Sequence, residues 1–209
     1  MCVHLCHQYP FLSSVSIIEK GCFFGCSSLS SLSIPSSVNM IGDECFYGCK
    51  SLSSISIPSS VSKIGNKCFS KCPNLNRLFI DMNNKHFVAE DDVIFNKEKN
   101  KIVEYLHSNR RISYSIPSSV RVVGDHCFTG SRFLSSITIP SSVSLIGSYC
   151  MSGCTTLSSI SIPSSVRTIG DRCFYECISV SSISIPRSVS YIGKGCFYNC
   201  TSLSSVSIP

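Results

Sequence analysis

Tryptophan is absent from this chain, and charged side chains are scarce. Of its 209 residues only 14% are Asp, Glu, Lys or Arg, and the formal net charge is +6. No stretch of Lys and Arg is as dense as a nucleic-acid-binding arm, so the composition indicates no nucleic-acid partner. No segment approaches the roughly 18 consecutive apolar residues that a membrane-spanning helix needs, and residues 1–18 lack the basic start of a signal peptide. The sequence therefore predicts a soluble protein without a membrane span.

The motifs of known catalytic centres are missing too. The chain contains no G-x-S-x-G, no H-E-x-x-H and no phosphate-binding glycine loop. Its five histidines do not recur at a regular spacing. Serine is abundant, but it becomes a nucleophile only where a base lies within hydrogen-bonding distance. We interpret the acidic run Glu90-Asp91-Asp92 as a solvated loop rather than a cation site. We therefore expect no enzyme, no metal and no cofactor.

What the chain does contain is a repeat of 23 residues. Prolines stand at positions 35, 58, 117, 140, 163, 186 and 209, so every gap is 23 residues except one of 59. This spacing predicts three regular repeats over residues 12–80, one enlarged repeat over 81–116, and four regular repeats with a final proline over 117–209. Residues 1–11 keep the same register and are interpreted as a decayed half-repeat. The whole chain, 1–209, is thus predicted to be a single solenoid domain.

The apolar spacing changes along each repeat. Leu52, Ile55 and Ile57 end one repeat in L-x-x-I-x-I, and this period of two predicts a short strand with one buried face. The cysteines of C-F-x-x-C are four residues apart, as on one side of a helical turn. Asp43 follows a glycine where a helix N-cap is expected, and Gly65 is expected to permit a backbone conformation that larger residues resist. Stacked copies then bury a continuous core. The predicted fold is an α/β solenoid, with a parallel β-sheet on one wall and turns plus short helices on the other.

The repeated run C-x-x-L-x-x-I-x-I-P-x-S-V-x-x-I-G-x-x-C-F-x-x-C resembles the BspA-like leucine-rich repeat family. The resemblance covers residues 12–209. Members of this family more often carry alanine where Cys45 and its equivalents stand. The resemblance implies surface display, adhesion and protein–protein contact. It carries no shared catalytic residues over to this chain.

The enlarged repeat differs in composition from the others. Residues 81–111 hold six basic and six acidic residues and almost no serine. The β-favouring runs 93–95 and 102–105 are separated by residues 96–100, and this pattern predicts a hairpin. It also resembles a variant repeat of the same family. Two roles stay open: an edge element that stiffens the coil, or a dedicated recognition element.

The chain has 15 cysteines, which allow three interpretations. Six C-x-x-x-C pairs start at positions 22, 45, 68, 150, 173 and 196. Metal binding fits poorly because zinc knuckles usually have C-x-x-C spacing, and disulfides between neighbouring repeats would place the Cβ atoms slightly too far apart. We favour buried thiols that act as small apolar side chains. At the start of the chain, Cys2, His4, Cys6 and His7 look like a metal cluster, but the repeat register turns the histidines outward and Cys6 inward.

The strand wall is predicted to present two outward rows of small hydroxyl side chains. Members of these rows are Ser54, Ser56, Ser159, Ser161, Ser182 and Ser184. Arg77 and Phe79 interrupt both rows at one level, and arginine and aromatic side chains are the types that concentrate binding energy. A candidate interaction patch therefore consists of Arg77 and Phe79 with three lysines of the insert. These lysines are Lys97, Lys99 and Lys101. Alternatively, the insert folds over Phe79 and covers it.

These observations predict a non-catalytic repeat module that binds a protein or a cell-surface macromolecule. The resemblance favours an adhesion or surface-antigen-like scaffold at the cell surface. Free thiols and the missing signal peptide favour a cytoplasmic location instead, and the alternative function is an intracellular adaptor that docks onto a regulatory enzyme. Because the sequence stops at the end of a predicted strand, self-association through an open solenoid end is a further expectation.

Overall fold

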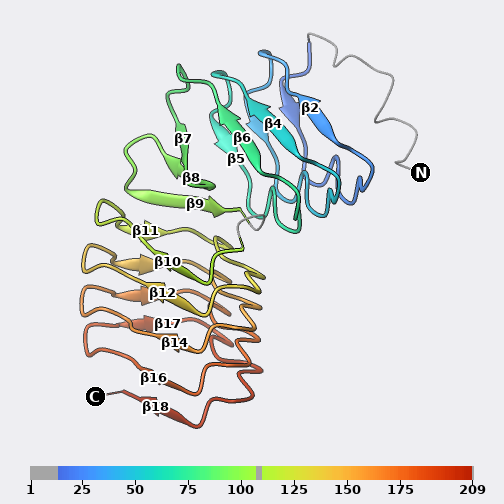
Figure 1. Cartoon of the computed structure of the whole chain (residues 1–209). Helices are drawn as coiled ribbons and strands as arrows, with labels where there is room; N and C mark the ends of the chain where they lie inside the picture. The colour runs from blue at the N-terminus through green and yellow to red at the C-terminus, as the bar shows by residue number, and fades with distance from the viewer. Residues whose placement is uncertain (1–13, 107–109, 209) are drawn as a thin grey trace. The chain divides into compact units, whose positions relative to one another are not determined.

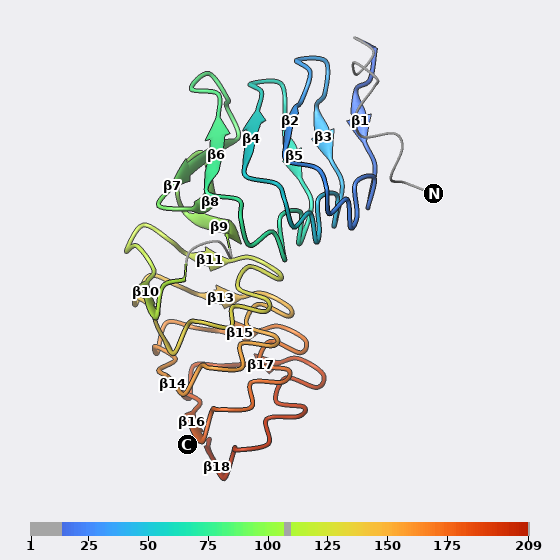
Figure 2. The ribbon, with the colours of Figure 1, turned by 45° about the vertical axis from the view of Figure 1, so that its right-hand side comes forward.

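The computed structural model describes residues 14–106 and 110–208. Their contacts divide the chain into two compact units. Unit 1 contains residues 14–98 and 104–106, and unit 2 contains residues 99–103 and 110–208. Within each unit the backbone coils repeatedly, one coil stacked on the next (Figure 1, Figure 2). The predicted half-repeat at 1–11, with its cysteines and histidines, lies outside the described residues.

Unit 1 has two parallel sheets, and each coil contributes one strand to each of them. The first sheet has the order β2-β4-β6 and the second the order β1-β3-β5. Paired residues are 23 positions apart, as for Ser54 with Arg77 and Met40 with Lys63. The bounds are β1 Ile17–Ile18, β2 Ser31–Ser33, β3 Met40–Ile41, β4 Ser54–Ile57, β5 Lys63–Ile64 and β6 Arg77–Ile80.

Unit 2 repeats this arrangement. Its first sheet is in two parts, which together occupy one side of the coils. The first part comprises β10 (Ser113–Ser115), β12 (Ser136–Thr138) and β14 (Ser159–Ile160), and the second comprises β16 (Ser182–Ser184) and β18 (Ser205–Ser207). Its second sheet comprises β11 (Val122–Val123), β13 (Leu145–Ile146), β15 (Thr168–Ile169) and β17 (Tyr191–Ile192). Strand β9 (Lys101–Tyr105) joins the second sheet through its first two residues, which pair with β11. In this pairing Lys101 meets Val122, so the offset is 21 residues at the enlarged repeat.

The third side of each coil is a series of turns, and the predicted short helices are wrong. No residue of 14–106 or 110–208 is helical. Two residues of each turn segment, four positions apart, have positive φ, and a right-handed helix does not admit them. The first of each pair is Gly21, Glu44, Lys67, His126, Tyr149, Arg172 or Gly195, and the second is Gly25, Gly48, Lys71, Gly130, Gly153, Glu176 or Asn199.

The backbone amides of these turns bond alternately within and between coils. In one coil Tyr47 N–H donates to the Glu44 carbonyl and closes a turn at 3.1 Å, as does Cys49 N–H to Phe46. Phe46 N–H instead donates to the Cys68 carbonyl of the next coil at 2.9 Å. In a helix these amides would bond to the carbonyl four residues back in the same segment. The chain is therefore a β-solenoid with three hydrogen-bonded sides.

The core lies inside the coils and consists of stacked equivalent side chains. Val61, Ile41 and Ile57 are fully buried. The phenylalanine that follows the first cysteine stacks on its equivalent in the next coil. Phe46 and Phe69, for example, have ring centroids 5.5 Å apart and nearly parallel planes. Each such side chain stabilises the fold by about 1.5–3 kcal/mol relative to an exposed one.

The enlarged repeat contains the hairpin that the sequence predicts and a second hairpin just before it. β7 (Phe87–Glu90) pairs antiparallel with β8 (Val93–Asn96). The predicted pairing of residues 93–95 with residues 102–105 is confirmed, because β8 and β9 are hydrogen-bonded neighbours in one sheet. The turn between β7 and β8, which the sequence did not predict, is Asp91-Asp92, where both residues have positive φ, 49° and 62°. Two-residue hairpin loops favour this conformation because its twist matches that of the flanking strands.

Candidate functional site

The outward face of the first sheet holds the two predicted rows. In unit 1, Ser54 pairs with Arg77 and Ser56 with Phe79. In unit 2 the rows contain Ser113, Ser136, Ser159, Ser182 and Ser205 beside Ser115, Thr138, Ser161, Ser184 and Ser207. Ser161 lies directly after β14. The register therefore gives this face rows of small hydroxyl groups, interrupted in unit 1 by an arginine and a phenylalanine.

Serine serves two different purposes on this scaffold. Three positions of the repeat donate a hydroxyl proton to a carbonyl of the preceding coil, as Ser53 Oγ does to Ser30, Ser142 Oγ to Val120 and Ser190 Oγ to Arg167. In contrast, the hydroxyls of the outward rows form no hydrogen bond within the described part of the chain. They remain available to an external partner.

Arg77 and Phe79 are exposed on the same face of β6. Phe79 is 60% exposed, and Met82, just after the strand, is 87% exposed. The alternative in which the insert covers Phe79 is therefore wrong. Burial of an exposed aromatic ring by a partner is favourable in proportion to the apolar area removed from water.

The three lysines of the candidate patch are divided between the two units. Lys97 belongs to unit 1 and lies at the end of the hairpin, where its N–H donates to the His86 carbonyl at 2.8 Å. Lys99 and Lys101 belong to unit 2. Lys101 is part of the second sheet, where it pairs with Val122. The structure thus places Arg77 and Phe79 together on one strand, and the patch with all three lysines stays a prediction.

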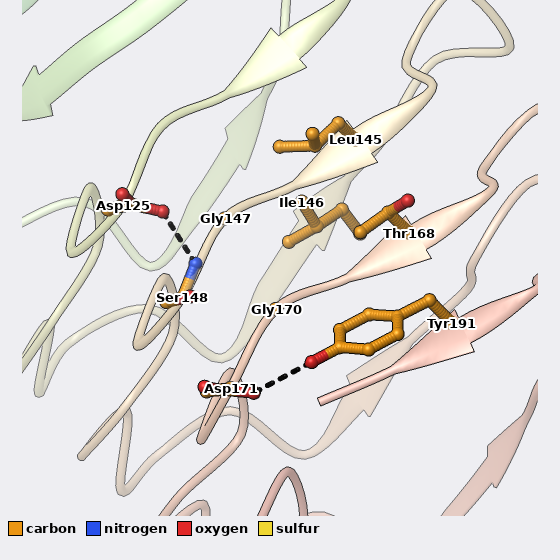
Figure 3. A pocket seen from close by; sticks show the side chains of 9 residues that line it. All are labelled: Asp125, Leu145, Ile146, Gly147, Ser148, Thr168, Gly170, Asp171 and Tyr191. Atoms are coloured by element: carbon orange, nitrogen blue, oxygen red, sulfur yellow. Dashed lines mark hydrogen bonds between the residues drawn. The ribbon is translucent and has the colours of Figure 1, made fainter. Parts of the chain in front are cut away.

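A groove on the second sheet was not predicted. In unit 2 it is lined by Asp125, Leu145, Ile146, Gly147, Ser148, Thr168, Gly170, Asp171 and Tyr191, with a volume of about 180 Å³ (Figure 3). A groove of about 290 Å³ occupies the same position of the repeat in unit 1, lined by Glu19, Lys20, Met40, Gly42, Asp43, Lys63 and Gly65. Two occurrences at one repeat position show that the repeat itself forms the groove.

The floor of the groove has no side chains, because Gly147 and Gly170 lie directly against the backbone of the preceding coil. A Cβ atom on Gly147 would lie 2.6 Å from the Asp125 nitrogen and 2.7 Å from the Gly124 carbon. These glycines do not have positive φ, so the expectation that Gly65 permits an unusual conformation is wrong. The glycine is needed for close approach of two backbones.

The aspartates that follow these glycines bind the next coil. Asp125 Oδ1 accepts the N–H of Ser148 at 2.7 Å, and Asp171 Oδ1 accepts the N–H of Lys194 at 2.9 Å. Asp43 does the same for Asn66. The predicted helix N-cap is therefore a cap on the equivalent amide of the neighbouring coil. Tyr191 O–H also donates to Asp171 Oδ1 at 3.2 Å (Figure 3). The charge of Asp171 and this hydrogen bond raise the pKa of Tyr191.

The cysteines of the regular repeats lie in the core as free thiols. Most are buried, whereas Cys22 is exposed. The second cysteine of a pair donates its S–H to a carbonyl of the preceding coil, as Cys154 does to Phe128 at 3.1 Å. Burial raises the pKa of Cys45 and Cys154 to about 12. In the described residues no three His, Cys, Asp or Glu side chains converge as metal ligands would.

The chain belongs to the BspA-type leucine-rich repeat family. The sequence model of the family described as the BspA type leucine rich repeat region matches residues 6–112 and 100–209. Comparison with curated proteins gave no match. In residues 14–106 and 110–208, no helix has the length and apolar character required to cross a membrane.

Several solved structures share this fold. The pneumococcal vaccine antigen PcpA is 22% identical, with a TM-score of 0.76 over 92% of this chain and 53% of that one. A leucine-rich repeat protein of Eubacterium ventriosum is 23% identical, with a TM-score of 0.69 over 93% and 70%. A leucine rich cell surface protein of Faecalibacterium prausnitzii is 25% identical, with a TM-score of 0.64 over 90% and 62%. The chain thus spans about half the length of the pneumococcal antigen.

Proposed function

We propose that this chain is a non-catalytic binding module that acts as an adhesion or surface-antigen-like scaffold. Its contact surface is the outward face of the first sheet, with Arg77 and Phe79 as anchors. The main support for this proposal is that Phe79 is 60% exposed beside Arg77, on a strand face whose other outward residues are serines. The similar structures include a vaccine antigen and a cell surface protein, which supports display at a surface.

The outward face of the first sheet combines small hydroxyl side chains with one aromatic ring and one guanidinium group. A flat row of serines offers hydrogen bonds but little apolar area, so by itself it binds weakly. An aromatic ring and a guanidinium group at the same level add apolar burial and directional donors, and these side chains dominate the energetics of protein interfaces. We therefore expect Arg77 and Phe79 to carry most of the affinity, with the serines as a complementary surround.

The test is a binding assay with the purified chain against extracellular matrix proteins and intact epithelial cells. The variant Arg77→Ser/Phe79→Ser is compared with Tyr198→Ser, because Tyr198 is also 60% exposed but lies among the turns of unit 2. We expect the double variant to bind at least about tenfold more weakly and the control to bind like the parent. Circular dichroism shows that both variants fold. Normal binding by the folded double variant, or no target bound by the parent, would refute the proposal.

The second candidate function, an intracellular adaptor for a regulatory enzyme, is favoured by the free thiols, since reducing compartments keep cysteines unpaired. The two functions differ in location. Intact source cells are treated with a membrane-impermeant amine reagent, and the chain is recovered for mass spectrometry. Labelling before lysis supports the surface scaffold, whereas labelling only after lysis supports the adaptor.

A further inference from the structure

The groove of unit 2 has two chemically different sides. On one side, Leu145, Thr168 and Tyr191 follow one another on β13, β15 and β17 (Figure 3). On the other side, beyond the glycines, stand Asp125 and Asp171 (Figure 3). One side thus offers an aromatic ring and aliphatic groups, and the other offers carboxylate oxygens.

The carboxylates are held in fixed positions before any ligand arrives. Oδ1 of each aspartate accepts an amide proton of the next coil, at 2.7 Å for Asp125 and 2.9 Å for Asp171. The Tyr191 hydroxyl adds a further bond to Asp171 at 3.2 Å. Polar groups that are already oriented lose little entropy on binding. The second oxygen of each carboxylate can therefore accept hydrogen bonds from a ligand at little cost.

The charge around the groove favours a neutral ligand. The lining contains two carboxylates and no cation, which disfavours phosphates, nucleic acids and acidic peptides. Three exposed cations lie beside the lining and disfavour a polycation: Arg167 precedes Thr168 and Arg172 follows Asp171 in sequence, and the amide of Lys194 donates to Asp171. In unit 1 the equivalent groove is lined by Lys20 and Lys63 and has no aromatic side chain, so the two grooves are not chemically equivalent.

We propose that the unit 2 groove binds a neutral glycan chain that runs along the stack of coils. Successive pyranose rings of such a chain present apolar faces to Leu145 and Tyr191, which are two coils apart, and hydroxyl groups that donate to Asp125 and Asp171. Small-ligand sites combine apolar contact with a few placed polar groups in this way. Coils spaced about 4.8 Å apart place Leu145, Thr168 and Tyr191 at successive levels along such a chain. This site is separate from the Arg77 and Phe79 surface and goes beyond the function proposed above.

The test uses neutral hexasaccharides of defined linkage (cellohexaose, chitohexaose and laminarihexaose) in calorimetric and saturation-transfer NMR titrations of the whole chain. We expect saturable binding of at least one of them. Tyr191→Ala should weaken it about tenfold, and Asp171→Asn should weaken it while retaining the amide cap. Tyr191 is 53% exposed, so its replacement leaves the core intact, which circular dichroism checks.

Matched controls separate this site from other surfaces. Tyr198→Ala removes an exposed tyrosine among the turns of the same unit, and Lys63→Ala alters the unit 1 groove; both should bind like the parent. Arg77→Ser/Phe79→Ser should also leave glycan binding unchanged, so failure of either proposal is distinguishable from failure of the other. The groove assignment is overturned if no hexasaccharide binds, if only a heparin hexasaccharide or a lysine-rich peptide binds, or if folded Tyr191→Ala binds normally.

Discussion

The side chain of Glu104 accepts a hydrogen bond from the backbone amide of Phe69 at 2.9 Å. In regular coils this amide bonds to a carbonyl of the next coil, as Phe46 does to Cys68 and Phe128 to Cys150. The enlarged repeat provides no such carbonyl there, and Glu104, only 2% exposed, occupies its place. Burial raises the pKa of Glu104 from 4.5 to about 8. A carboxylic acid that is neutral at pH 7 presents a C=O group much like that of the missing peptide.

Because a titratable carboxyl group takes the place of a backbone carbonyl, the stability of unit 1 depends on pH. Between pH 4.5 and 8 the folded chain keeps a proton on Glu104 that the unfolded chain has lost. The free energy of unfolding should therefore fall as pH rises through this window, by at most about 1.4 kcal/mol per pH unit from this group. Urea denaturation at several pH values measures the slope. Glu104→Gln keeps a carbonyl for Phe69 and should remove this contribution, whereas Glu98→Gln, at an exposed carboxylate, should not. Equal slopes for the parent and Glu104→Gln would contradict the assignment.

Two glycines of unit 2 should respond very differently to substitution. Gly147→Ala forces a methyl group against the backbone of the preceding coil, and we expect it to lower the free energy of unfolding by about 2–3 kcal/mol. At Gly130 the φ angle is +76° and nothing lies within 4 Å of an added Cβ. Asn199 occupies the equivalent position with φ 59°, so Gly130→Asn should change stability by less than about 0.5 kcal/mol. Chemical denaturation compares the two, and similar losses would argue against the close-approach explanation.

The alternation along β4 predicts opposite responses at neighbouring residues. Ile57 is fully buried, whereas Ser56 is exposed. Ile57→Glu loses apolar burial and places a carboxyl group in the core, so we expect a loss of at least about 3 kcal/mol. Ser56→Glu should cost less than about 0.5 kcal/mol. The measurement is the urea midpoint of each variant, and comparable damage at both sites would contradict the register.

Thiol reactivity should follow burial. At pH 8 the buried Cys45 and Cys154, whose pKa is about 12, are almost entirely protonated, and the thiolate is the reactive form. Cys22 is exposed and should react with iodoacetamide in the folded protein. Peptide mapping after timed labelling should therefore show modification at Cys22 long before Cys45 or Cys154, and rapid modification of all three in denaturant. Rapid labelling of Cys154 in the folded chain would show that this coil opens.

The strand register could be predicted because stacked coils bring equivalent side chains together. Once Ile55 and Ile57 face inward, Ser54 and Ser56 must face outward, and a 23-residue period pairs Ser54 with Arg77. The second strand of each coil was missed because it spans only two residues, as in Lys63–Ile64. An alternation of polar and apolar residues cannot be recognised over so short a segment.

The turns and the groove depend on backbone geometry that residue spacing does not specify. Cysteines four residues apart, such as Cys45 and Cys49, fit either a helical turn or two successive β-turns. Positive φ at Glu44 distinguishes them, but glutamate is not a residue type that signals it. The groove floor arises from contact between the backbones of neighbouring coils. The role of Glu104 depends on the length of the insert, which decides where β9 runs.

Bonding between nearest coils also determines how unit 2 would respond to mechanical force. Because the sheet and turn hydrogen bonds of a coil reach only the coils beside it, tension on the chain would load one interface at a time. A coil pulled from the stack frees 23 residues, which span about 80 Å when extended, while the remaining coils keep their partners. Unit 2 would therefore lengthen in discrete steps under load, each step releasing one coil, rather than unfold in a single event.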